Sequence, residues 1–173
     1  MSIGASNWER LAVWIVGLLV VAASLGIGFV GTPFTGSPDA VAAVDADENV
    51  TISSMGDGYV LTPASGTAGD DGPLAGTALI FYPGARVHPN AYLPVLAPVV
   101  AETGLTVYIP KPTLNLAVFD QNMAGPIIQS HPAVDEWYVG GHSLGGAMAC
   151  RYAARNPDQL SGLVLFGSYC DRD

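Results

Sequence analysis

Residues 136–146 read EWYVGGHSLGG. The first four residues predict a buried strand, and the residues from Gly145 to about Asn156 predict a helix. Between these two elements, Gly141, Ser143 and Gly145 fit the pattern G-x-S-x-G. A sharp strand-to-helix turn strains its central residue, and glycines on either side of that residue leave room for the turn. The segment therefore predicts a nucleophilic serine at position 143. The alternative is a glycine-rich turn whose serine is incidental.

Short apolar runs alternate with helical patterns along most of the chain. Residues 77–82 (TALIFY) form a continuous apolar run, as expected of a strand buried on both faces. Asn90 is suited to cap a helix that Gly104 ends. We expect strands over residues 50–53, 59–62, 77–82, 105–109, 136–139 and 160–166, and helices over residues 90–102, 115–123 and 145–156. The first two strands flank a glycine-rich turn and predict a hairpin.

This alternation predicts an α/β fold, with a mostly parallel sheet and helices on both faces. In such sheets, ligands bind beyond the carboxyl ends of the strands, where Ser143 is expected. An oxyanion hole needs two backbone N–H groups close to the nucleophile. Leu144 would supply one of them, and Ala85 in the loop after the strand at residues 77–82 would supply the other. The alternative for Pro83 and Gly84 in that loop is a plain turn.

Several motifs together resemble the α/β-hydrolase fold-5 family over about residues 78–169. The motifs are FYPGARV at 81–87, IPKP at 109–112, LNLAVF at 114–119 and GGHSLGG at 140–146. The resemblance implies an α/β-hydrolase fold, a serine nucleophile at Ser143 and hydrolysis of an ester-type bond in a small molecule. It implies no cofactor, and the sequence shows no metal-ligand spacing.

The sequence departs from this family in its catalytic triad, which runs serine, acid, histidine along the chain. No histidine follows Ser143; the three histidines are at positions 88, 131 and 142. Asp171, just after the last expected strand, is the acid candidate, and Asp158 and Asp173 are the remaining carboxylates after the serine. We therefore expect a hydrolase domain truncated before its acid and histidine. One alternative is an inactive remnant or binding protein, and another is a structural membrane protein whose turn is incidental.

The N-terminal part of the chain is dominated by an uncharged apolar run, LAVWIVGLLVVAASLGIGFV, at residues 11–30. Its length predicts a transmembrane helix over residues 11–31, with residues 1–10 in the cytoplasm. The alternative is a cleaved secretory signal. Both interpretations place the hydrolase domain, residues 50–173, outside the cytoplasm. Residues 32–49 lack apolar periodicity and are expected to form a flexible linker.

The chain is acidic, with 15 Asp and Glu residues against 6 Lys and Arg residues and a net charge of -9. Such a surface excludes nucleic acid as a partner, because it cannot neutralise phosphates. It is also typical of salt-adapted proteins, since salt screens self-repulsion; the alternative is a merely acidic domain. Cys150 and Cys170 are expected to be unpaired thiols, with a disulfide as the alternative outside the cytosol.

Overall fold

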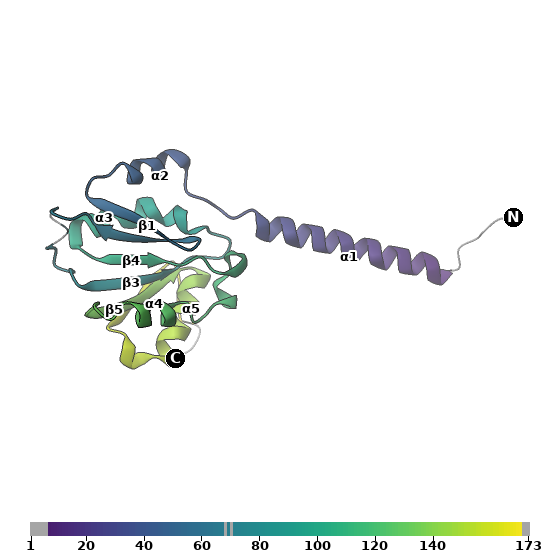
Figure 1. Ribbon diagram of the computed structural model, residues 1–173. Coiled ribbons are helices and arrows are strands. Elements are labelled where there is room, and N and C mark those ends of the chain that lie inside the picture. Colours follow the sequence, from purple (N-terminus) through teal and green to yellow (C-terminus); the bar gives the residue numbers. More distant parts are fainter. Residues whose placement is uncertain (1–6, 68, 70, 171–173) are drawn as a thin grey trace. The chain divides into compact units, whose positions relative to one another are not determined.

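The computed structural model describes residues 7–67, 69 and 71–170 (Figure 1). The chain divides after Pro33 into two compact units, and all strands of the described residues belong to the second unit. The second unit begins at Phe34, before the domain start expected at residue 50.

The first unit contains helix α1, Asn7–Gly31, where the sequence predicts a helix. In the described part of the chain, no helix combines the length and the apolarity needed to cross a membrane. The predicted transmembrane helix, and the membrane as its partner, are therefore not supported.

The second unit is built on a six-stranded sheet with strand order β1-β2-β4-β3-β5-β6. The strands are β1 Val50–Met55, β2 Gly58–Pro63, β3 Thr77–Tyr82, β4 Thr106–Ile109, β5 Glu136–His142 and β6 Gly162–Phe166. Strands β4, β3, β5 and β6 are parallel, whereas β1 and β2 form the predicted hairpin and β2 runs antiparallel to β4. The prediction of a mostly parallel α/β sheet is confirmed.

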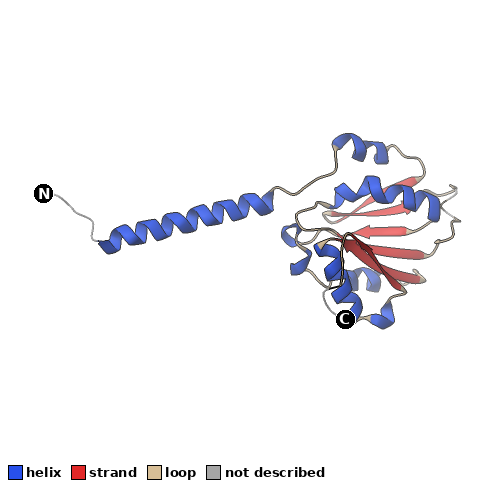
Figure 2. Ribbon diagram, turned by 180° about the vertical axis from the view of Figure 1, so that it is seen from behind, coloured by secondary structure: helices blue, strands red, loops and turns tan. Residues whose placement is uncertain are grey.

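Helices cover both faces of the sheet (Figure 2). Side chains of β3 alternate between the two faces: Leu79 and Phe81 lie in one apolar cluster, and Ile80 and Tyr82 in the other. The first cluster includes α2 (Pro38–Asp45) and α3 (Leu93–Thr103), and the second includes α4 (Ala124–Ser130) and α5 (Leu144–Arg155). The central strand β3 is consequently buried along its whole length.

The predicted flexible linker at residues 32–49 contains a packed helix instead. Ser37 caps α2 by accepting a hydrogen bond from the Ala40 N–H, and Val44 is buried in the first apolar cluster. Before α2, Phe34 pairs with Val87 in an isolated parallel bridge. The alanine-rich composition that suggested a linker also favours a short helix, which the contact with α3 stabilises.

The prediction of a helix over residues 115–123 is also wrong. Leu114 and Asn115 have φ values of 54° and 55°, which a continuous α-helix excludes, and two 3-10 turns, Thr113–Asn115 and Ala117–Phe119, occupy this region. The α-helix begins later, at Ala124. Pro126 fits within its first turn, where the missing N–H has no intrahelical acceptor to lose.

Helix α3 begins three residues later than predicted, after the 3-10 turn Pro89–Tyr92. Asn90 does not cap it; His88 caps the preceding turn, and Asn90 Oδ1 accepts a hydrogen bond from the Gly36 N–H. Gly104 ends α3 in the left-handed conformation, φ 80°, as predicted. A last 3-10 turn, Pro157–Gln159, separates α5 from β6.

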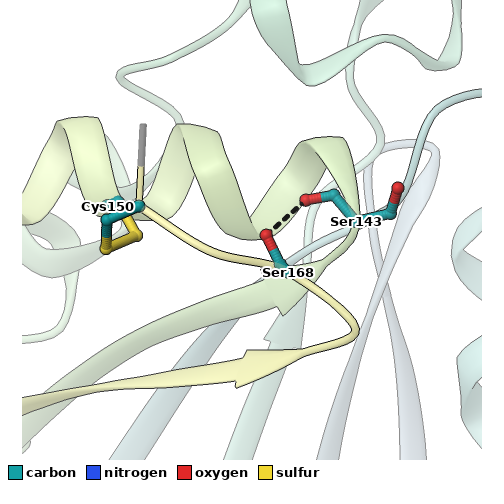
Figure 3. The surroundings of a disulfide bond; sticks show 4 residues. Ser143, Cys150 and Ser168 are labelled. Atoms are coloured by element: carbon teal, nitrogen blue, oxygen red, sulfur yellow. Dashed lines mark hydrogen bonds between the residues drawn. A yellow bond between two sulfur atoms is a disulfide. The ribbon is translucent and has the colours of Figure 1, made fainter. Parts of the chain in front are cut away.

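Cys150 and Cys170 form a disulfide, so the expectation of two free thiols is wrong (Figure 3). Cys150 lies in α5, and Cys170 lies in the segment that follows β6. Because α5 packs against β6, the chain leaving β6 passes along this helix and brings two cysteines separated by 20 residues to a Cα–Cα distance of 5.4 Å.

Candidate active site

Ser143 occupies the junction between β5 and α5 in a strained backbone conformation, φ 52° and ψ −125°. A Cβ atom on Gly141 would lie 2.5 Å from the Tyr82 carbonyl oxygen, and one on Gly145 would collide with the same oxygen. Both glycines are therefore required by the close approach of β3, as the motif predicts. The side chain of Ser143 is exposed at the carboxyl end of the sheet.

Three hydrogen bonds hold the Ser143 main chain, two from the backbone and one from a side chain. Its N–H donates to the Phe166 carbonyl oxygen at 3.1 Å, and its own carbonyl oxygen accepts from the Ala147 N–H at 3.2 Å. The same carbonyl oxygen accepts from Ser168 Oγ at 2.7 Å. Figure 3 shows the Ser143 side chain directed away from Ser168. The main chain is thus fixed while the hydroxyl remains open to a ligand.

The backbone N–H groups of Leu144 and Ala85, the predicted oxyanion hole, are both free of hydrogen bonds to neighbouring loops in the described part of the chain. Leu144 is the first residue of α5, where N–H groups lack intrahelical acceptors. In the loop after β3, the Gly84 N–H donates to Tyr92 Oη and the Arg86 N–H donates to the Asn115 carbonyl oxygen. Among the hydrogen bonds of the described residues, the Ala85 N–H makes none, and Ala85 is exposed.

The loop after β3 lies directly against the nucleophile turn. A Cβ atom on Gly84 would lie 2.7 Å from His142 Nδ1, so only glycine permits this approach. Tyr92 Oη accepts a hydrogen bond from the Gly84 N–H at 2.8 Å and lies 3.2 Å from His142 Nδ1. Burial raises the pKa of Tyr92, while the bond from Gly84 opposes that rise. The hydroxyl therefore stays neutral, and its proton is available to His142 Nδ1.

An apolar cavity of about 180 Å³ opens beside this contact. It is lined by Phe81, Tyr92, Val95, Leu96, His142 and Phe166. Because His142 precedes Ser143 and Phe166 accepts the Ser143 N–H bond, the cavity adjoins the residues that hold the nucleophile turn.

The other two histidines are engaged away from Ser143. His88 Nδ1 accepts from the Asn90 N–H at 3.3 Å and caps the turn Pro89–Tyr92. His131 Nδ1 lies 2.8 Å from the Ile127 carbonyl oxygen, and the His131 ring packs on Tyr108. His131 precedes β5 and thus lies at the end of that strand opposite Ser143.

Of the acidic candidates after Ser143, Asp158 alone lies among the described residues, and it is not close to the serine in the fold. Asp158 lies in the turn beyond the carboxyl end of α5. Asp171 and Asp173 lie outside the described residues, so the assignment of Asp171 stays a prediction. In the described part of the chain, no three His, Cys, Asp or Glu side chains gather as a metal site requires.

Ser168 and the contact of Tyr92 with His142 were missed from the sequence. Ser168 follows β6, whose carboxyl end lies beside that of β5 because the two strands are parallel neighbours. The rule that functional residues follow strands could have pointed to Ser168. No comparable signal marks Tyr92, whose contact with His142 spans 50 residues of sequence.

A strained serine between a parallel strand and a helix, on a sheet covered by helices on both faces, defines the α/β-hydrolase class of proteins. The model of the alpha/beta hydrolase family matches residues 78–173. The chain belongs to that family. A search of curated protein sequences finds no match.

Solved structures of similar fold include three esterases or lipases. Carboxyl esterase 2 from the mycorrhizal fungus Tuber melanosporum is 18% identical with a TM-score of 0.50, over 72% of this chain and 47% of the esterase. A bacterial heroin esterase is 20% identical with a TM-score of 0.45, over 74% of this chain and 48% of that protein. A bacterial membrane phospholipase A is 20% identical with a TM-score of 0.45, over 93% of this chain and 52% of that protein. The chain spans about half the length of these proteins.

Proposed function

We propose that this chain is the nucleophile-bearing part of a serine hydrolase that cleaves ester-type bonds in small molecules. The observation that carries the proposal is the strained conformation of Ser143 between β5 and α5, φ 52° and ψ −125°. Strain of this kind concentrates at functional sites, because surrounding structure must hold it in place. Membership of the alpha/beta hydrolase family supports the same conclusion.

In the proposed reaction, Ser143 Oγ attacks the ester carbonyl carbon while a general base accepts the hydroxyl proton. The N–H groups of Leu144 and Ala85 stabilise the negative oxygen of the tetrahedral intermediate. The intermediate collapses, the alcohol leaves with a proton, and water then hydrolyses the acyl-enzyme. The apolar cavity beside His142 would accept an apolar part of the substrate.

Among the described residues no hydrogen bond joins a histidine to Ser143, so we infer a general base beyond them, with Asp171 as the candidate acid. The second candidate function is a binding protein of hydrolase fold. It is favoured by the same observation, because His88, His131 and His142 are each engaged with other residues.

We further propose that the domain acts outside the cytoplasm. The disulfide between Cys150 and Cys170 supports this location, because such bonds persist in oxidising compartments. The apolar N-terminal segment is suited to direct export. The net charge of -9 supports adaptation of this domain to a saline environment.

A fluorophosphonate probe that reacts with activated serines tests the hydrolase proposal. The wild-type chain should be labelled slowly, because the oxyanion hole acts here without the general base. Ser143→Ala should abolish this labelling, and Ser161→Ala, which alters an exposed serine before β6, should retain it. Labelling that survives in Ser143→Ala would exclude Ser143 as the nucleophile. If the folded wild-type chain is not labelled, the result favours the binding protein.

A further inference from the structure

The segment after β6, residues 167–170, lies along the first two turns of α5, and we call it the clamp segment. Ser168 Oγ donates a hydrogen bond of 2.7 Å to the Ser143 carbonyl oxygen. That oxygen also accepts the Ala147 N–H, which is a hydrogen bond of the first turn of α5. Ser168 therefore holds the peptide group at which the strained turn becomes a helix.

Packing and a covalent bond hold the clamp segment in place. A Cβ atom on Gly146 would lie 2.6 Å from Ser168 Cβ and Oγ, so the clamp segment rests on α5 only because residue 146 is glycine. Two residues beyond Ser168, Cys170 is bonded to Cys150, which is about two turns along α5 from Ser143. Figure 3 shows the disulfide and the Ser168 hydrogen bond on the same helix.

We propose that Ser168, held by the Cys150–Cys170 disulfide, is a positioning residue for the nucleophile. A left-handed, non-glycine conformation such as that of Ser143 persists only when its surroundings enforce it. The Ser168 hydroxyl fixes the carbonyl side of Ser143, and the Phe166 carbonyl oxygen fixes its N–H side. Both fixing groups belong to β6 or the clamp segment, so the state of the disulfide reaches the nucleophile. The effect of Ser168 on the reactivity of Ser143 rests on the proposed function, whereas its effect on the conformation of the nucleophile turn does not.

The disulfide can be opened from the solvent, because Cys170 is exposed while Cys150 is buried. A dithiol such as dithiothreitol would attack the Cys170 sulfur as a thiolate and release Cys150 as a thiol. Its second thiol then displaces Cys170 from the mixed disulfide. The products are one cyclic disulfide of the oxidised reagent and two protein thiols, so the electrons balance.

Amide hydrogen exchange tests the proposal without requiring catalysis. In Ser168→Ala, the amides of Ser143 and Ala147 should exchange roughly 2- to 10-fold faster, as the loss of one hydrogen bond allows. Dithiothreitol, or the double variant Cys150→Ala/Cys170→Ala, should produce an increase of the same kind. Ser130→Ala is the matched control, because it removes a hydroxyl-to-carbonyl bond of 3.0 Å to Ile127 at the end of α4.

Unchanged exchange at Ser143 and Ala147 in Ser168→Ala would overturn the positioning role. An increase in that variant, with no change on reduction, would overturn the part assigned to the disulfide. The rate of fluorophosphonate labelling is a second readout, and it should fall in Ser168→Ala and recover in Ser168→Thr, which keeps the hydroxyl. Absent labelling in the wild type counts against the proposed function, while the exchange result still decides the role of Ser168.

Discussion

Gly145 shows how one missing side chain permits the nucleophile turn. A Cβ atom at this position would collide with the carbonyl oxygens of Tyr82 and Pro83, which belong to the backbone and cannot rotate away. We expect Gly145→Ala to destabilise the domain by about 2 kcal/mol or more, since overpacking typically costs about 1–3 kcal/mol and here the backbone at the end of β3 must move.

Chemical denaturation measures this change in the free energy of unfolding. Gly17→Ala in α1 is the matched control, because a Cβ atom there meets nothing within 4 Å. If Gly145→Ala unfolds at the same denaturant concentration as the wild type, β3 does not approach the nucleophile turn as closely as the structure shows.

Tyr92 couples the loop after β3 to the nucleophile turn through its hydroxyl group. Removing that group in Tyr92→Phe leaves the Gly84 N–H and His142 Nδ1 without their hydrogen-bond partner. We expect a loss of stability of about 1–2 kcal/mol and slower fluorophosphonate labelling, because the loop that carries Ala85 is less firmly held.

Thermal unfolding and labelling rates together check this prediction. Tyr169→Phe provides the control, since Tyr169 is 77% exposed in the clamp segment and its hydroxyl contributes little. Equal stability of Tyr92→Phe and the wild type would mean that the hydroxyl bridge is not formed.

At the residue scale, the sequence predicted the local part of the site and missed the part that depends on distant contacts. The strain at Ser143 and the need for Gly141 and Gly145 follow from one pattern of five residues. The contact of Ser168 with Ser143 spans 25 residues and that of Tyr92 with His142 spans 50, and no local pattern encodes either.

Helix α2 belongs to the folded domain even though its sequence resembles a linker. Val44 is 8% exposed and packs in the apolar cluster that also contains α3. We expect Val44→Ala to destabilise the domain by about 1–2 kcal/mol, as the loss of two buried methyl groups predicts.

The neighbouring substitution Ala43→Ser alters an exposed position of the same helix and should change stability far less. Urea denaturation distinguishes the two variants. Equal effects would mean that α2 does not pack on the domain and that residues 32–49 behave as the linker predicted from composition.

Strands were predicted more accurately than helices for a physical reason. A buried parallel strand such as β3 reads as an unbroken apolar run, and its limits, Thr77–Tyr82, match those predicted. The helix expected over residues 115–123 failed because the left-handed Leu114 and Asn115 interrupt it. Their conformation is supported by tertiary contact, since the Asn115 carbonyl oxygen accepts the Arg86 N–H, and propensity cannot reveal such a contact.

The candidate site of the domain lies at the carboxyl ends of the strands. The neighbouring strand β6 is the last strand on one side of the sheet. Leu163 and Phe166 of β6 are 36% and 44% exposed, unlike the residues of the central strand β3. The clamp segment is therefore held chiefly by α5 and by the disulfide. The nucleophile turn is consequently fixed by α5 and the disulfide as well as by the sheet.

The net charge of -9 destabilises the folded state, because negative charges repel one another more strongly in a compact chain. Salt weakens this repulsion by screening the charges. We expect the thermal midpoint to rise as NaCl increases from about 0.1 M to about 1 M, because the screening length falls from roughly 10 Å to roughly 3 Å. A gain of about 1 kcal/mol would raise the midpoint by roughly 4 °C.

The control replaces four exposed carboxylates with neutral amides: Glu48→Gln, Glu102→Gln, Glu136→Gln and Asp158→Asn. With four fewer negative charges, repulsion is weaker from the outset, so this variant should respond less to salt and be more stable at low salt. A general salt effect on apolar burial would instead raise both midpoints equally. Equal responses would therefore contradict adaptation through charge, whereas a smaller response in the variant would locate the effect in the acidic surface.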